Sequence, residues 1–98
     1  GTSDHELGHI YGQVTGYHDG DKAQEWENIY QQIVEQNPSV LRDYAYTNIY
    51  ECYADCFAEY IDSKNGNPDF NSYDLKKIVV EVDGKEITMY DYFDNMLN

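Results

Sequence analysis

The sequence predicts a mainly α-helical domain with one short β-hairpin, an α+β fold. Three observations support this prediction. Apolar residues recur at helical spacing in several segments. Capping residues stand in front of several of these segments. The pair Asp83-Gly84 separates two short runs that can form strands. The chain has 98 residues, so we expect residues 1–98 to form one small domain.

The first half of the chain contains two predicted helices. Residues 4 to about 17 are predicted to form a helix that Ser3 caps, with Glu6 at the capping-box position. Gly16, followed by His18-Asp19-Gly20, ends this helix. Residues 22–36 read as a second helix, which stops before Pro38 because the residue before a proline avoids helical geometry. The apolar stripe of this second helix comprises Trp26, Ile29, Tyr30, Ile33 and Val34.

The second half adds two more helices around the hairpin. A loop over 39–47 leads into a helix over 48–63, which ends at Asn65-Gly66. After a further loop, residues 78–82 and 85–87 form the predicted hairpin. Thr88 then caps the last helix, with Asp91 at the capping-box position. The predicted buried face of the third helix consists of Tyr50, Ala54, Phe57 and Ile61, and that of the last helix consists of Tyr90, Phe93 and Leu97.

Charge and composition exclude several classes of function. The formal net charge is -13, from 19 acidic and 6 basic residues. Such a surface does not attract nucleic acid, whose phosphates need basic partners, and anionic membranes would repel it. No apolar run reaches the roughly 18 residues that a membrane span needs. Cys52 and Cys56 stand four apart in a helical stretch, where a disulfide is strained, so we expect free, partly buried thiols.

The segment His5-Glu6-Leu7-Gly8-His9 has the pattern H-E-x-x-H. Residues four apart share one face of a helix, so both imidazoles point to one spot and can bind one zinc ion. Glu6 lies one step round the helix, where it can act as general base on a water that zinc activates. The bare pattern also arises by chance on ordinary helices, so a third ligand has to support it.

Two places for the third ligand can be compared. In the extended pattern H-E-x-x-H-x-x-G-x-x-H, Gly12 fits, but Thr15 occupies the ligand position and His18 comes three residues too late. We therefore interpret His18 as a surface loop histidine. Glu51, on the third predicted helix, would complete a His-His-Glu set with the fourth position open for water, as in catalytic zinc sites. Asp55, one turn further, is placed to accept the outer N–H of a liganding histidine, most plausibly His5.

The stretch from Tyr44 to Phe57, YAYTNIYECYADCF, resembles the second motif of the anthrax lethal factor family of zinc metallopeptidases, which are of the gluzincin type and related to the Pro-Pro endopeptidases. The shared features are Tyr44, Thr47-Asn48, the zinc-binding Glu51, Ala54 and an acidic residue at 55. The resemblance implies that Tyr44 stabilises the oxyanion, although Tyr46 is a close rival for this role. It also implies a secreted, bacterial, toxin-like protein with a polypeptide substrate.

The same resemblance sets the expectation for the whole domain. It implies the C-terminal, helix-rich part of a zincin-like metallopeptidase domain, in an N-terminally truncated piece whose upstream sheet is absent. An upstream domain of the same parent chain would then be a partner for full activity. Asp55 departs from the family's more usual glutamate, and Cys52 and Cys56 also depart from its pattern. The expected function is a zinc-dependent endopeptidase, and the alternative is a non-catalytic protein-binding module on a lethal-factor-like fold.

Overall fold

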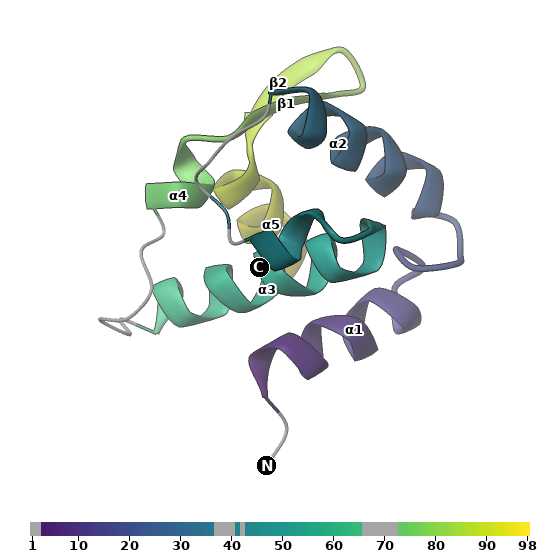
Figure 1. Cartoon of the computed structure of the whole chain (residues 1–98), viewed down its shortest axis with the longest axis vertical. Helices are drawn as coiled ribbons and strands as arrows, with labels where there is room; N and C mark the ends of the chain where they lie inside the picture. The colour runs from purple at the N-terminus through teal and green to yellow at the C-terminus, as the bar shows by residue number, and fades with distance from the viewer. Residues whose placement is uncertain (1–2, 37–40, 42, 66–72) are drawn as a thin grey trace.

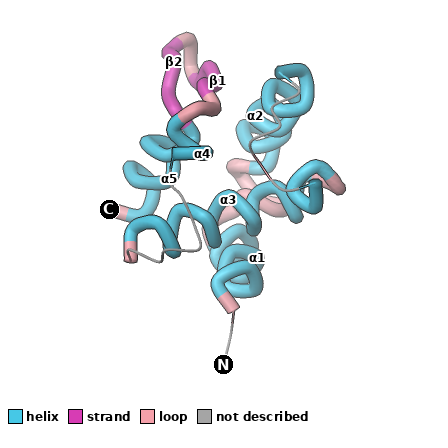
Figure 2. Tube along the Cα trace, turned by 60° about the vertical axis from the view of Figure 1, so that its left-hand side comes forward, coloured by secondary structure: helices cyan, strands magenta, loops and turns pink. Residues whose placement is uncertain are grey.

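The computed structural model describes residues 3–36, 41, 43–65 and 73–98. In it, one central helix separates two layers. This helix, α3 (Ile49–Lys64), has α1 (Asp4–Val14) packed along one side (Figure 1). On its other side lie α2 (Ala23–Gln36) and α5 (Met89–Leu97). Figure 2 shows the hairpin at the far end of the molecule from α1. The predicted mainly helical α+β class is therefore confirmed.

Two helix starts are fixed by the capping residues that the sequence offers. Ser3 Oγ accepts a hydrogen bond from the backbone N–H of Glu6 at 3.1 Å, so α1 begins where predicted. Asn48 Oδ1 accepts from the N–H groups of Tyr50 and Glu51, at 3.0 and 2.9 Å. This cap puts Glu51 in the first turn of α3, where the positive end of the helix dipole favours a carboxylate.

The first helix ends earlier than the predicted residue 17, in a Schellman turn. Gly16 has φ +87°, the left-handed conformation that glycine adopts without strain. The N–H of Tyr17 donates to Gly12 O at 2.7 Å, and that of Gly16 donates to Gln13 O at 3.4 Å. The chain thereby reverses after α1 and runs back alongside its last turns.

A largely aromatic core fills the space between α3, α2 and α5. Trp26 is fully buried, and its Nε1 donates to Ile49 O at 2.7 Å, which ties α2 to the start of α3. Tyr53 and Phe93 are fully buried beside it, and their ring centroids lie 5.1 and 5.9 Å from the Trp26 ring. Val34, placed on the buried stripe of α2 by the sequence, is 43% exposed.

The hairpin consists of β1 (Val79–Val82) and β2 (Lys85–Thr88), paired antiparallel with Val82 opposite Lys85. Asp83 and Gly84 both have positive φ, 53° and 78°, as a type I′ turn requires. Thr88 caps α5 as predicted, through the N–H of Asp91. A short helix, α4 (Tyr73–Lys76), was not predicted, and a short 3₁₀ helix, η1 (Asp43–Tyr46), lies in the predicted loop 39–47.

The predicted buried face of α3 is wrong at Tyr50, which stands in the first turn of the helix. Ala54 and Phe57 are buried, whereas Tyr50 is 37% exposed and its hydroxyl donates to Asp19 Oδ1 at 3.1 Å. Asn65 caps the helix, while Gly66 lies outside the described residues. In the described part of the chain, none of the helices combines the length and the apolar character that crossing a bilayer requires.

Candidate metal centre

The close approach of α1 to α3 positions the candidate site. A Cβ added to Gly8 would lie 3.0 Å from Ala54 Cα and 3.1 Å from Phe57 Cβ. Glycine on one helix and alanine on the other therefore let the two backbones pack closely. Because His5 and His9 flank Gly8 on α1, this contact brings both imidazoles to the start of α3.

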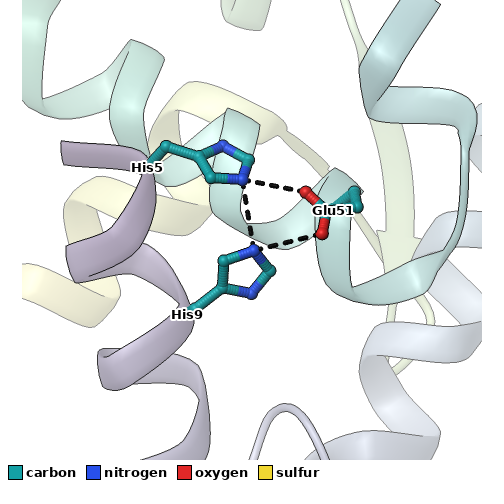
Figure 3. A group of neighbouring side chains, drawn as sticks. All are labelled: His5, His9 and Glu51. Atoms are coloured by element: carbon teal, nitrogen blue, oxygen red, sulfur yellow. Dashed lines mark hydrogen bonds and ion pairs between the residues drawn. The ribbon is translucent and has the colours of Figure 1, made fainter. Parts of the chain in front are cut away.

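Three side chains from two helices converge at this contact: His5 and His9 from α1, and Glu51 from α3 (Figure 3). Their ligand atoms all lie within 4.8 Å of one another. His5 Nε2 lies 2.8 Å from Glu51 Oε2, and His9 Nε2 lies 3.3 Å from Glu51 Oε1. The two Nε2 atoms are 3.1 Å apart. The three residues predicted as metal ligands are thus brought together.

The spacing of these atoms fits a small divalent cation. Ligand atoms at about 2.0–2.1 Å from a tetrahedral zinc ion stand roughly 3.3 Å from one another. The observed separations of 2.8, 3.1 and 3.3 Å require only small adjustments to reach this value. Two imidazole nitrogens and one carboxylate also form a donor set that zinc prefers, and one that related divalent metals accept.

Asp55 fixes the orientation of the first imidazole. Its Oδ1 lies 2.8 Å from His5 Nδ1, and Asp55 is only 6% exposed. A carboxylate only accepts hydrogen bonds, so the proton of this bond sits on His5 Nδ1. The other ring nitrogen, Nε2, faces Glu51 and His9, so it is the atom through which His5 would bind a metal. The predicted contact between Asp55 and His5 is present.

Glu51 remains favoured in its charged form despite its partial burial. Burial alone raises the pKa of the Glu51 carboxyl, but hydrogen bonds from His5 and Tyr44 and the nearby charge of His9 outweigh this effect and lower the pKa overall. A carboxylate that stays ionised is the form that binds a metal.

Of the two candidate tyrosines, Tyr44 lies at the site and Tyr46 does not. The Tyr44 ring centroid is 5.7 Å from that of His5, the residue is 51% exposed, and its side chain hydrogen-bonds Glu51. Tyr46 packs against the core instead, where burial raises its pKa. The 3₁₀ turn of η1, which contains both residues, presents one side chain to the site and the other to the core.

Glu6 follows His5 on α1, and its side chain is exposed to solvent. Successive helical residues are rotated by about 100°, so Glu6 points to the edge of the face that carries both histidines. A cavity of about 230 Å³ opens beside His5, with Asp4, Ala58 and Glu59 among its lining residues. Asp55 also lines this cavity, whereas His9 and Glu51 do not, so it lies on the Asp55 side of His5. The site itself has a solvent-accessible carboxylate in Glu6.

The interpretation of His18 as a surface histidine is wrong. His18 is only 5% exposed, and its Nε2 lies 3.0 Å from His9 Nδ1. The Schellman turn at Gly16 brings it back against α1, and Gly12 makes room for its ring. Burial lowers the pKa of His18, and the proximity of His9 lowers it further. A glycine at 12 and a glycine turn at 16 were the sequence signals that could have indicated this contact.

Cys52 and Cys56 are free, as predicted, but fully rather than partly buried. A hydrogen bond with Cys52, together with burial, raises the pKa of the Cys56 thiol. Both thiols lie in the core, so we assign them a packing role.

Comparisons of the chain with protein-family models, with curated protein sequences and with solved structures give no match.

Proposed function

We propose that this chain is a zinc-dependent endopeptidase whose metal is held by His5, His9 and Glu51. The observation that carries the proposal is the convergence of two imidazole nitrogens and a carboxylate, within 4.8 Å of one another, from two different helices. Asp55 behind His5 and Tyr44 beside Glu51 add the partners that such a site requires. The segment 44–57 resembles the second motif of the lethal factor family, and this resemblance also supports the proposal.

The proposed reaction is hydrolysis of a peptide bond in a polypeptide substrate. A bound zinc ion would supply Lewis acidity, which polarises a carbonyl group and lowers the pKa of a water molecule. Glu6 takes the proton from the attacking water and passes it to the nitrogen of the leaving amine as the C–N bond breaks. The Tyr44 hydroxyl donates a hydrogen bond to the carbonyl oxygen as negative charge develops on it.

Two properties of the site support hydrolysis over a structural role for the metal. Within the described residues three side chains converge, which leaves a fourth position for solvent or substrate, whereas structural zinc sites are closed by four. His5, His9 and Glu51 are each partly exposed, at 25, 27 and 19% of their side-chain surface, so solvent reaches the proposed ligands. From the resemblance to the lethal factor family, we further propose that the domain is zincin-like and that the protein is secreted.

The first experiment measures zinc content by elemental analysis in protein purified without chelator. We expect near-stoichiometric zinc, lost in His9→Ala and retained in Glu6→Gln. Chelator should lower the melting temperature of the parent protein because the ion links α1 to α3, and a ligand at 1,000 times its Kd contributes about 4 kcal/mol. Absence of zinc, with an unchanged melting temperature, would overturn the proposed metal site.

The second experiment tests hydrolysis on a mixed-sequence peptide library, with this chain and with the longer parent chain that the resemblance implies. We expect cleavage that depends on zinc. The Glu6→Gln variant should keep its zinc but should not cleave. Glu27→Gln, an exposed acid on α2, is the matched control and should cleave normally. A zinc-loaded protein that cleaves nothing in either form would refute the peptidase and favour the protein-binding module.

A further inference from the structure

His18 makes a contact that the three metal ligands do not explain. Its Nε2 lies 3.0 Å from His9 Nδ1, the nitrogen on the opposite side of the ring from the one that faces Glu51. The two rings meet edge to face, with centroids 5.3 Å apart. His18 therefore stands behind His9 as Asp55 stands behind His5.

The residues around His18 leave a space that fits its imidazole ring. A Cβ on Gly12 would lie 2.4 Å from His18 Nδ1, so only glycine leaves space for the imidazole there. The rings of Tyr50 and Tyr53 lie 5.1 and 5.5 Å away on other sides. These contacts hold the imidazole in one place against α1.

Packing alone does not account for an imidazole in this space. Its second nitrogen, Nδ1, is buried and has no hydrogen-bond partner within the described residues. A buried polar group without a partner lowers the stability of the fold. A phenylalanine would fill the same space without this cost, and within the described residues the one hydrogen bond that the imidazole makes is to His9.

We propose that His18 is a positioning residue of the metal site: its Nε2 accepts the Nδ1–H of His9, which leaves the Nε2 lone pair of His9 free for the metal. This inference rests on the proposed metal site. The two histidine ligands would then be oriented by different partners, His5 by the carboxylate of Asp55 and His9 by the neutral imidazole of His18.

The decisive variants are His18→Phe, which keeps the ring and removes both nitrogens, and His18→Gln, whose side-chain oxygen can accept in place of Nε2. We measure the zinc Kd by chelator competition and the melting temperature of the metal-free protein. We expect His18→Phe to weaken zinc binding about 10–100-fold. Its metal-free melting temperature should be equal or higher, because the unpaired nitrogen is gone. His18→Gln should recover most of the affinity.

A spectroscopic readout accompanies the affinities. In the zinc-loaded protein, the ring N–H proton of His9 should exchange slowly with water, and His18→Phe should make this exchange fast. The ring N–H of His5, which is bonded to Asp55, is the internal control and should stay unchanged.

The outcomes separate the two proposals. Zinc binding by His18→Phe as tight as by the parent protein overturns the role of His18 and leaves the metal site intact. If His18→Phe and His18→Gln lose zinc affinity to the same extent, and both also lower the metal-free melting temperature, the proposal is overturned in favour of a packing role for His18. A parent protein that binds no zinc overturns the metal site and this inference together.

Discussion

His5 Nδ1 and Asp55 Oδ1 lie 2.8 Å apart across the contact between α1 and α3. The acceptor is buried, at 6% exposure, so the bond is shielded from competing water. It fixes the ring of His5 with its Nε2 toward Glu51, as a metal ligand requires. The same bond joins the two helices that supply the proposed ligands, so it affects both the site and the packing.

We predict that Asp55→Asn weakens zinc binding about 10-fold and Asp55→Ala about 100-fold, because partners of liganding histidines contribute effects of this size. The amide can still accept from His5, but it lacks the charge that makes the imidazole a better ligand. Chelator competition measures the Kd. Asp62→Asn, an acid two turns further along α3, is the matched control and should bind zinc like the parent protein. Equal affinities for all three variants would contradict the prediction.

The two tyrosines of η1 give a paired test of catalysis. We predict that Tyr44→Phe lowers kcat about 100-fold, the order of effect seen when one oxyanion donor is removed, with the zinc Kd changed much less. Tyr46→Phe should leave kcat unchanged, because Tyr46 packs on the core and not on the ligands. Steady-state hydrolysis of a cleaved library peptide gives kcat. A reversed order of effects would assign the oxyanion role to Tyr46.

Local patterns predicted the parts of this protein that depend on neighbours in the chain. The two histidines share a face because residues four apart on a helix must, and Ser3 and Thr88 cap the helices that follow them. Asp83-Gly84 specified the hairpin, because only such residues accept two consecutive positive φ values readily. The strand boundaries differ by one residue from the predicted ones, at 79 and 88.

Features that depend on packing between helices were harder to predict. The pairing of Glu51 with the histidines came from the resemblance and from the small residues on one face, since nothing in the spacing fixes how α1 lies on α3. Tyr50 was misplaced because an apolar stripe does not show which turns of a helix its neighbours cover, and the first turn of α3 leaves Tyr50 exposed. His18 was missed because its burial follows from a chain reversal at Gly16, and the glycines at 12 and 16 were not interpreted as the signals of that reversal.

The helix contact at Gly8 leads to a prediction about stability. In Gly8→Ala the new methyl group would meet Ala54 Cα at 3.0 Å and Ala54 O at 3.1 Å, both backbone atoms of α3. Overpacking of this kind costs about 1–3 kcal/mol. The better helix propensity of alanine offsets up to about 1 kcal/mol. We expect a net loss of stability and weaker zinc binding, because α1 must move away from Glu51.

Chemical denaturation of the metal-free protein measures the loss in Gly8→Ala. The control is Val14→Ala, on the same helix at a position that is 80% exposed, which should be close to neutral. A Gly8→Ala protein as stable as its parent, with unchanged zinc affinity, would show that α1 and α3 tolerate a wider separation.

Three of the buried phenols, those of Tyr17, Tyr53 and Tyr92, make the fold sensitive to alkali. Burial raises the pKa of each above the ordinary value of 10.0, because the phenolate loses its hydration inside the core. A pKa that is raised in the folded state means that the fold binds more protons than the unfolded chain above pH 10. The stabilisation is therefore complete below about pH 10 and is lost as the pH rises above it.

We predict that the free energy of unfolding falls above pH 10 by up to about 1.4 kcal/mol per pH unit for each of these phenols. The late part of the phenolate absorbance change, which the buried rings contribute, should coincide with the loss of far-UV circular dichroism, because these rings ionise only when the core opens. Tyr92→Phe removes one such group and should make the fall less steep. Phenolate absorbance from all tyrosines at about pH 10, with the fold intact, would contradict the burial of these three hydroxyls.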